Sequence, residues 1–425
     1  MTRKDYVGVP YAQRATGKEI VFIRHAESKG NVDGLWHGVT DGPLSERGEA
    51  SLEALAKRMS GWDIDVVISS PLERTRRTAG AVRSEVVIDE DFIEMDVGRW
   101  EGLSFEETER DHRDELEAAF RDWDVPLGGT GESLNQVAAR AYAAMQKVLD
   151  RLSDGQRAVV VTHGGFLQPI IERHLPGRQR RVHPIASNTS LTRLVVQWDR
   201  TRLASFNDTG HLGPRSRSVE HYLGEGVPVF ALIRHGRTRA NTEQRWQGHG
   251  DWSLDDEGLR QAELLGQWYG KAERVYASPL QRAMTTAEHV ARNGIVQVDG
   301  LKEMHMGEWE GLTSEEILEQ WSDAMDVIYR HGVDLRRGVT GESWGELTAR
   351  VSNTIADLEP ASGEPTVVVA HGGAIRSYIS SLTDTDDAYS ESLFTPQNTS
   401  VSHIAMLPEG PVILDFAVAT HLETD

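Results

Sequence analysis

The stretch VFIRHAES at residues 21–28 decides the fold of this chain, because it returns as ALIRHGRT at residues 231–238. In each copy a short apolar run, typical of a buried strand, ends in Arg-His. The two histidines, His25 and His235, are 210 residues apart. A repeat of this length indicates two copies of one fold.

Further motifs recur in the same order and at nearly the same offset. They are Ser-Pro-Leu-x-Arg at 70–74 and 278–282, Gly-Glu-Ser at 131–133 and 341–343, His-Gly-Gly at 163–165 and 371–373, and Asn-Thr-Ser at 188–190 and 398–400. Most of the repeated residues are polar and reactive. The duplication therefore preserves chemistry as well as a core.

The length of 425 residues suits two domains of about 200 residues each. We expect a polar N-terminal extension at 1–18, a first domain at 19–207 and a second domain at 227–425. Residues 208–226 are rich in Gly, Arg and Ser, and we expect them to form the linker.

Each half alternates strand and helix patterns. Residues 46–59 and 256–269 have the apolar spacing of helices, and the β-branched runs at 158–161 and 366–369 are typical of buried strands. Each Ser-Pro follows another strand-like run and predicts a helix with the serine as its N-cap. The pattern predicts an α/β sandwich with a mainly parallel sheet in each domain, whose ligands bind beyond the carboxyl ends of the strands.

Composition narrows the classes of function. Lys and Arg number 45 against 66 Asp and Glu, a net charge of −21, which argues against binding nucleic acid or anionic membranes. The absence of cysteine excludes disulfides, thiolate metal sites and a cysteine nucleophile. No signal-peptide or membrane-spanning run is evident, so we expect a cytoplasmic location.

The strand ends bring together the groups that phosphoryl transfer needs. In the first half, Arg24, His25, Arg74 and His163 would form a compact cationic pocket. Arginines bind phosphate oxygens and stay charged, and a neutral imidazole is a competent nucleophile toward phosphorus. Positioning and charge stabilisation then suffice without a metal or other cofactor. Glu94 is the candidate acid that protonates the leaving alkoxide.

On these motifs the chain resembles two tandem members of the histidine phosphatase superfamily, the phosphoglycerate mutase-like proteins of branch 1. The resemblance implies an α/β/α sandwich of the phosphoglycerate mutase-like fold in each domain. It implies that His25 and His235 are the nucleophiles and that Glu94 and Glu303 are the proton donors. The phosphate pocket would be formed by Arg24, Asn31, Arg74 and His163 in the first domain, and by Arg234, Asn241, Arg282 and His371 in the second. It implies no metal and no cofactor.

Some alternatives stay open at this point. Ala26 stands where the family usually has glycine, which is compatible with function if its φ is negative. Asp96 or Glu101 might replace Glu94 as the acid, and the two asparagines could simply cap turns.

The function expected is phosphomonoester hydrolysis of small phosphorylated metabolites, with a site in each domain. The alternatives are a phosphoglycerate mutase-type transfer, or one catalytic domain with a regulatory or structural partner domain. Only 69 and 68 residues separate the expected acid from the His-Gly-Gly histidine in the two halves, shorter than in family mutases, which favours hydrolysis.

Substrate choice is expected to differ between the two sites. The segment 104–130 of the first half is crowded with acidic residues, whereas the matching segment of the second half ends in Arg336-Arg337. We therefore expect the second site to accept a substrate with an additional anionic group; the alternative is that these charges face solvent. The two domains could also pack as an intramolecular pseudo-dimer.

Overall fold

The computed structural model describes residues 17–176, 186–197, 200–383 and 392–423, so most of the expected N-terminal extension lies outside the described residues. The chain divides into two compact units. One contains 17–174, 186–197 and 200–201, and the other contains 175–176, 202–383 and 392–423. We call them the first and the second domain.

The first domain is built around a six-stranded sheet. Its strands are β1 (Lys18–Arg24), β2 (Val66–Ser69), β3 (Val87–Ile88), β4 (Arg157–Thr162) and β5 (Leu191–Gln197). The sixth strand of this sheet is β6 (Arg200–Asp208), whose residues from Arg202 onward are counted with the second unit. Their order is β3-β2-β4-β1-β5-β6. Strand β4 pairs in parallel with β1 and β2, whereas β5 is antiparallel to β1. Every residue of β4 is buried, as expected of a strand that helices cover on both faces.

The second domain repeats this arrangement. Its strands are β7 (Val229–Arg234), β8 (Val275–Ala277), β9 (Val296–Gln297), β10 (Thr366–Ala370), β11 (Val401–Leu407) and β12 (Gly410–Ile413). The order β12-β11-β7-β10-β8-β9 again has β10 parallel to β7 and β8, with β11 antiparallel to β7. Both sheets are mixed and mainly parallel, which confirms the predicted fold class.

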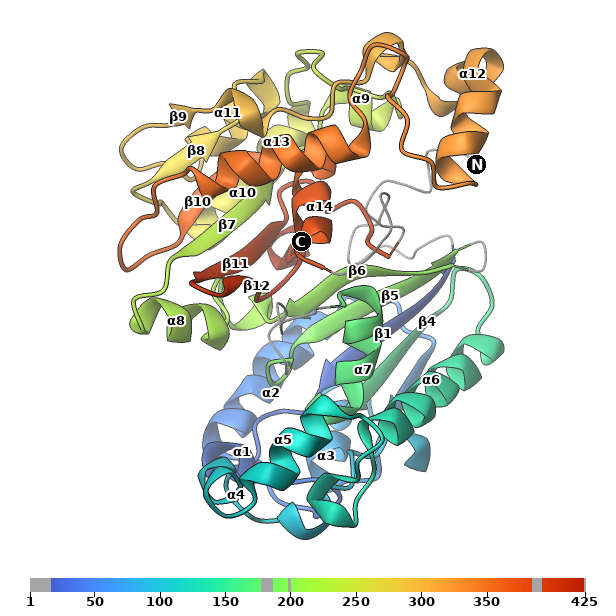
Figure 1. Ribbon diagram of the computed structural model, residues 1–425, viewed down its shortest axis with the longest axis vertical. Helices are drawn as coiled ribbons and strands as arrows, with labels where there is room; N and C mark the ends of the chain where they lie inside the picture. The colour runs from blue at the N-terminus through green and yellow to red at the C-terminus, as the bar shows by residue number, and fades with distance from the viewer. Residues whose placement is uncertain (1–16, 177–185, 198–199, 384–391, 424–425) are drawn as a thin grey trace. The chain divides into compact units, whose positions relative to one another are not determined.

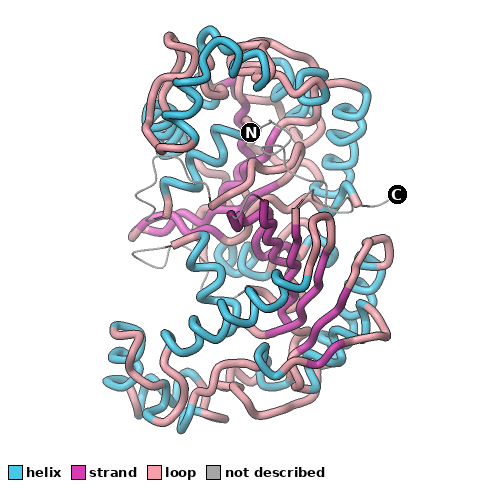
Figure 2. The backbone as a smooth tube through the Cα atoms, turned by 90° about the vertical axis from the view of Figure 1, so that its right-hand side faces the viewer, coloured by secondary structure: helices cyan, strands magenta, loops and turns pink. Residues whose placement is uncertain are grey.

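Helices cover both faces of each sheet (Figures 1 and 2). Those of the first domain are α1 (Lys29–Val32), α2 (Glu46–Met59), α3 (Glu73–Val82), α4 (Phe105–Asp111), α5 (Arg113–Arg121), α6 (Leu134–Arg151) and α7 (Gly164–His174). Those of the second are α8 (Arg217–Gly224), α9 (Arg239–Thr242), α10 (Asp256–Tyr269), α11 (Gln281–Glu288), α12 (Ser314–Tyr329), α13 (Trp344–Ala356) and α14 (Gly372–Ser381). In the first domain α2 packs against α3 and α6 against α7, and in the second α13 packs against α14.

Of two local predictions about helices, the structure confirms one and contradicts the other. The helices at 46–59 and 256–269 are confirmed as α2 and α10. The prediction of a helix beginning at each Ser-Pro is wrong, because α3 begins at Glu73 and α11 at Gln281. Their first amides donate to the carboxylates of Asp41 and Asp251, which come from distant loops. A cap supplied from another part of the chain leaves no local signature.

The stretch 208–226, expected as a linker, contains a full helix. Helix α8 presents Val219, which is buried and packs against Val229 and Leu414 of the second domain. Gly213, Pro214 and Ser216 precede α8, and Tyr222 and Leu223 of the helix pack against the same apolar cluster as Val219.

Candidate active site

The first site forms where parallel strands end side by side. Arg24 of β1 lies opposite Thr162 of β4, so the residues that follow, His25 and His163, come together. Their ring centroids are 5.2 Å apart. Ser70, which follows β2, places its Oγ 2.8 Å from His163 Nε2. Ser70 thus orients a site histidine and does not cap α3.

The second site has the same construction. The rings of His235 and His371 lie 5.1 Å apart, and Ser278 Oγ is 2.7 Å from His371 Nε2. In addition, Arg282 Nε donates to His371 Nδ1 at 3.2 Å. His371 therefore carries its proton on Nε2 and donates it to Ser278.

The histidines of the Arg-His motifs are held in one tautomer. His25 Nδ1 is 2.7 Å from its neighbour's carbonyl, Ala26 O, and His235 Nδ1 is 2.7 Å from Gly236 O. A carbonyl only accepts, so each Nδ1 donates and each Nε2 keeps its lone pair. Burial, reinforced by the neighbouring arginines, lowers the pKa of both imidazoles well below the ordinary value. Both rings are therefore neutral at neutral pH.

Alanine at position 26 does not disturb this arrangement. Ala26 is not among the residues with positive φ, and its amide donates to Thr78 Oγ1 at 2.9 Å. Gly236 donates to Thr286 at the same distance. The departure from the usual glycine is therefore accommodated.

Two arginines approach each histidine pair. Arg74 donates to the carbonyls of Thr40 and Gly38, each at 2.8 Å, and Arg282 likewise holds a loop through Gly250 and Gly248. Burial lowers the pKa of Arg282 to about 10, so its guanidinium stays charged at neutral pH.

The arginines that precede the histidines are poised for an anion. Burial lowers the pKa of Arg24 and of Arg234 to about 10, which leaves both charged. Each donates one bond, Arg24 to Ala186 O and Arg234 to Pro396 O, both at 2.6 Å. Within the described part of the chain, the buried Nε atoms of both lack a hydrogen-bond partner. A buried donor without an acceptor is costly, and a phosphate oxygen would satisfy it.

The asparagines have a turn role that uses only their side-chain oxygen. Asn31 and Asn241 complete capping boxes with Ser28 and Thr238 at the starts of α1 and α9. Asn241 also lines a pocket together with His235. The turn role that the sequence left open is present, and it is compatible with contact to a ligand.

The two candidate acids sit against helix N-termini. Glu94 accepts from the amides of Gly165 and Phe166 at 3.1 and 2.8 Å, and Glu303 accepts from Gly373 and Ala374 at 2.9 and 3.1 Å. Burial raises the pKa of Glu94, although these amides oppose the rise. A Cβ on Gly165 would lie 2.8 Å from the Glu94 carboxylate, so this approach requires glycine.

The alternative acids have other contacts. Asp96 accepts from Gly98 N at 2.8 Å within its own turn. Glu101 accepts from the amides of Gly38 and Thr40, in the loop that Arg74 also holds. Glu101 thus contacts the pocket loop, whereas Glu94 contacts the helix that begins with Gly164.

Two kinds of supporting residue complete each site. Asn188 and Asn398 donate to the carbonyls of His25 and His235 at 2.9 and 2.8 Å. Their Asn-Thr-Ser repeat was a visible signal without an assigned role. The glutamate of each Gly-Glu-Ser motif, whose partner is an arginine two turns along the next helix, is the second kind.

These glutamate–arginine pairs hold the loops that carry the candidate acids. Glu342 accepts two bonds from Arg350, both at 2.7 Å, and accepts from His305 N at 2.9 Å. Arg350 also donates to Glu303 O at 3.1 Å. In the first domain, Glu132 and Arg140 make the corresponding contacts, with Arg140 donating to Glu94 O at 3.3 Å.

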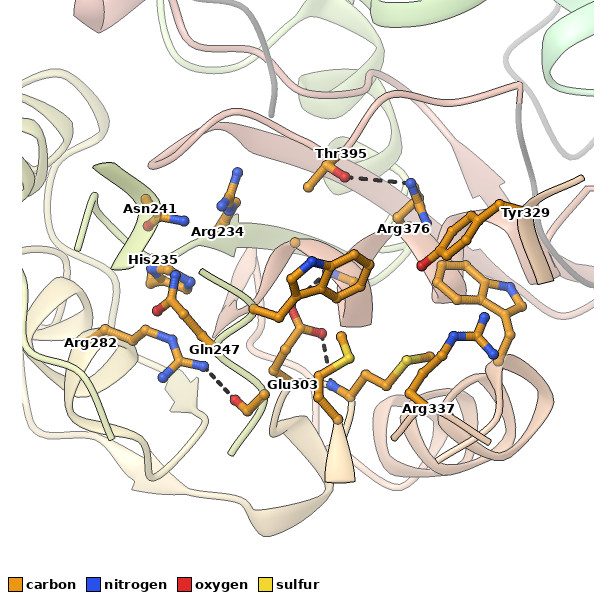
Figure 3. A pocket seen from close by; sticks show the side chains of 17 residues that line it. Arg234, His235, Asn241, Gln247, Arg282, Glu303, Tyr329, Arg337, Arg376 and Thr395 are labelled. Atoms are coloured by element: carbon orange, nitrogen blue, oxygen red, sulfur yellow. Dashed lines mark hydrogen bonds between the residues drawn. The ribbon is translucent and has the colours of Figure 1, made fainter. Parts of the chain in front are cut away.

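A pocket opens over the second site (Figure 3). At one end it is lined by Arg234, His235, Asn241 and Arg282. Tyr329, Arg337 and Arg376 lie together at its other end, and Glu303 lies between the two groups.

The described residues contain neither a membrane-spanning helix nor a metal-binding cluster. No helix in the described ranges has the length and apolarity to cross a membrane. Nor do the described ranges contain a cluster of three or more His, Asp or Glu side chains arranged to hold a metal ion.

Comparisons with known proteins find one family in both halves of the chain. The sequence pattern of the Histidine phosphatase superfamily (branch 1) matches residues 20–209 and again 230–418. The chain is similar to Phosphoglycerate mutase-like protein 4 of Arabidopsis thaliana, at 32% identity over 50% of this chain and 91% of that protein. It is also similar to the Metal-independent phosphoserine phosphatase of the same plant, at 33% identity over 38% of this chain and 71% of that protein. A solved structure, Bacillus stearothermophilus YhfR, aligns at 26% identity with a TM-score of 0.43, covering 46% of this chain and 99% of that one.

Proposed function

Because the chain belongs to the histidine phosphatase superfamily (branch 1), with both halves matched, we propose that it hydrolyses phosphomonoesters of small metabolites at one site in each domain. The observation that carries the proposal is the neutral histidine in each half whose Nδ1 is held by a carbonyl. Its Nε2 lone pair lies among guanidinium groups that can bind the phosphate.

In the first half-reaction, Nε2 of His25 attacks phosphorus and the ester P–O bond breaks. Arg24 and Arg74 bind the phosphoryl oxygens and stabilise their charge. Glu94, whose pKa is raised by burial, acts as the general acid and gives its proton to the leaving oxygen. The products are the free alcohol, phosphohistidine and the Glu94 carboxylate. In the second domain, His235, Arg234, Arg282 and Glu303 take these roles.

In the second half-reaction, water attacks phosphorus and the P–N bond breaks. The carboxylate of Glu94 takes a proton from this water, so the enzyme returns to its starting protonation state. The electron pair of the P–N bond returns to Nε2, and inorganic phosphate leaves. His163, beside His25 and oriented by Ser70, contacts the phosphoryl group during both steps.

Phosphate release tests the proposal. A panel of phosphorylated metabolites is given to the wild type, to His25→Ala, to His235→Ala and to the double variant, and acid-labile phosphate on the protein is measured after quenching in alkali. We expect each single variant to keep activity and labelling at the other site, and the double variant to lose both. Full activity in the double variant would overturn the proposal, and complete loss in one single variant would assign catalysis to one domain.

The mutase alternative is supported by similarity to proteins named as phosphoglycerate mutases, among them a 2,3-bisphosphoglycerate-dependent phosphoglycerate mutase of Methylobacterium. A mutase would return the phosphoryl group to another hydroxyl, so 2-phosphoglycerate would form from 3-phosphoglycerate. Phosphorus NMR of the reaction distinguishes the two outcomes directly. Hydrolysis gives inorganic phosphate as the only new signal.

A further inference from the structure

The far end of the second-site pocket carries two arginines that the proposed chemistry does not use. Arg337 and Arg376 line the pocket together with Tyr329 and Trp344. Figure 3 shows Arg376, Arg337 and Tyr329 grouped away from Arg282, His235 and Asn241. A substrate whose phosphate lies at His235 would therefore direct its other end toward these arginines.

Arg376 is held in place by its surroundings. It lies on α14, one turn beyond His371, and its guanidinium carbon is 4.7 Å from the centre of the Trp344 ring. Its Nη1 lies 3.5 Å from Thr395 Oγ1, another pocket residue. Because stacking on an aromatic face fixes the planar guanidinium, less conformational entropy is lost when Arg376 binds an anion.

Arg337 is almost completely buried, with 1% of its surface exposed. The carboxylate of Asp334 lies 3.6 Å from its Nη1. That carboxylate also accepts from the amides of Trp344 and Gly345, at the start of α13. Among the described residues that line this end of the pocket, the charged side chains are Arg337 and Arg376.

The first domain has neither arginine. Counted from the Gly-Glu-Ser motif, Leu127 and Leu134 stand at the positions of Arg337 and Trp344, and both belong to an apolar cluster. Counted from His-Gly-Gly, Gln168 stands at the position of Arg376. The first domain therefore lacks both arginines and also the tryptophan that contacts Arg376 in the second domain.

The structure also separates the two neighbouring arginines that the sequence had grouped. Arg336 is exposed and pairs with Glu346 on α13, so it lies outside the pocket. Of Arg336 and Arg337, Arg337 is the one that lines the pocket. Arg376 was not singled out from the sequence.

We propose that Arg376 and Arg337 form a subsite for a second anionic group, a carboxylate or a second phosphate, so that the second site prefers doubly anionic phosphoesters and the first does not. The inference rests on the proposed phosphatase function. It assigns different substrates to two sites whose reacting groups are the same.

Matched substrate pairs test the subsite in single-site proteins. His25→Ala retains only the second site, and His235→Ala only the first. We compare 3-phosphoglycerate with glycerol 3-phosphate, which differ in a carboxylate, and fructose 1,6-bisphosphate with fructose 6-phosphate, which differ in a phosphate. In the second-site protein, kcat/KM should favour at least one doubly anionic partner by about tenfold or more, as for a charge-assisted hydrogen bond. The pair that shows the preference identifies the anion. In the first-site protein, the ratio of kcat/KM for the doubly anionic substrate to kcat/KM for its singly anionic partner should be near 1 or below.

Arg376→Gln, which introduces the residue of the first domain, should bring the second-site ratio down toward 1 through a higher KM. Arg376→Lys should retain part of it. Arg336→Gln removes the same charge outside the pocket and is the matched control, with an unchanged ratio expected. Equal ratios in the two single-site proteins, or an Arg376→Gln ratio equal to the parent's, would overturn the subsite. Loss of p-nitrophenyl phosphate hydrolysis in the His25→Ala parent would instead overturn catalysis at the second site.

Discussion

A single imidazole in each domain illustrates how burial can serve chemistry. A protonated His25 between two arginines would be unfavourable, because desolvation and like charges both oppose the extra proton. The arginines that we propose bind phosphate therefore also keep the proposed nucleophile neutral. Once the phosphoryl group has transferred, its negative charge offsets the arginines. The arginines thus give the pocket an excess of positive charge before the substrate binds, and the transferred phosphoryl group reduces this excess.

Glu94→Gln and Glu303→Gln, each in the matching single-site protein, test the role of the acid. The glutamine oxygen can still accept from a helix amide, whereas its NH2 group cannot accept, and the side chain has no acidic proton to give to an alkoxide. We expect kcat on an alkyl phosphate such as glycerol 3-phosphate to fall by about 100-fold or more. p-Nitrophenol leaves without protonation, so hydrolysis of p-nitrophenyl phosphate should fall much less.

The alternative acid supplies the control for this experiment. Asp96→Asn should change both rates alike and only slightly, because Asp96 accepts within its own turn. A selective loss with alkyl phosphates in Asp96→Asn, and none in Glu94→Gln, would assign the acid to Asp96.

At the scale of elements, the loop that carries each acid depends on a helix that lies after it in sequence. Arg350 on α13 donates to the carbonyls of Gly300, Lys302 and Glu303, so one guanidinium fixes the backbone before and at the acid. Arg350→Met should lower kcat on alkyl phosphates by about 10- to 100-fold, because small displacements of a catalytic group are costly. The first-domain counterpart, Arg140→Met, should act in the same way on its own site.

The readout that identifies Arg350 as a positioning residue is the dependence on leaving group. If it acts through Glu303, p-nitrophenyl phosphate hydrolysis should fall less than alkyl phosphate hydrolysis. Equal losses with both substrates, in step with a lower unfolding free energy, would indicate a purely structural role.

The sequence predicted those parts of the fold and site that depend on local periodicity and on motifs at strand ends. Helices α2 and α10 followed from apolar spacing, and the meeting of His25 with His163 followed from parallel strands. Contacts between distant segments were not predictable. The capping of α3 by Asp41 depends on a loop that folds back onto the helix, and the position of Arg376 over Trp344 depends on how α14 packs against α13. Ser70 was misassigned for the same reason, because its partner is 93 residues away.

For the whole molecule, the buried histidines make folding stability depend on pH. The pKa of His25, His163, His235 and His371 is lowered well below its ordinary value, and burial lowers the pKa of His421 to about 3. The unfolded chain binds protons at these groups from about pH 6.5 downward, whereas the folded chain does not. Their contribution to stability is therefore fully present above about pH 6.5 and falls as the pH decreases, by about 1.4 kcal/mol per pH unit for each histidine. Most carboxylates titrate below this range, so relief of the excess negative charge does not offset the loss between pH 6.5 and 5.

His421 allows the pH dependence of folding stability to be tested at a residue outside the candidate sites. It lies stacked on Trp268, with its Nε2 2.9 Å from Thr399 Oγ1. Its replacement in His421→Gln should reduce the slope of unfolding free energy against pH by about 1.4 kcal/mol per unit between pH 6 and 5, whatever its effect at pH 7.5. Urea unfolding at a series of pH values, analysed separately for each transition, gives this slope. An identical slope in the wild type and in His421→Gln would contradict a neutral buried His421, because the folded protein would then bind the proton as readily as the unfolded chain.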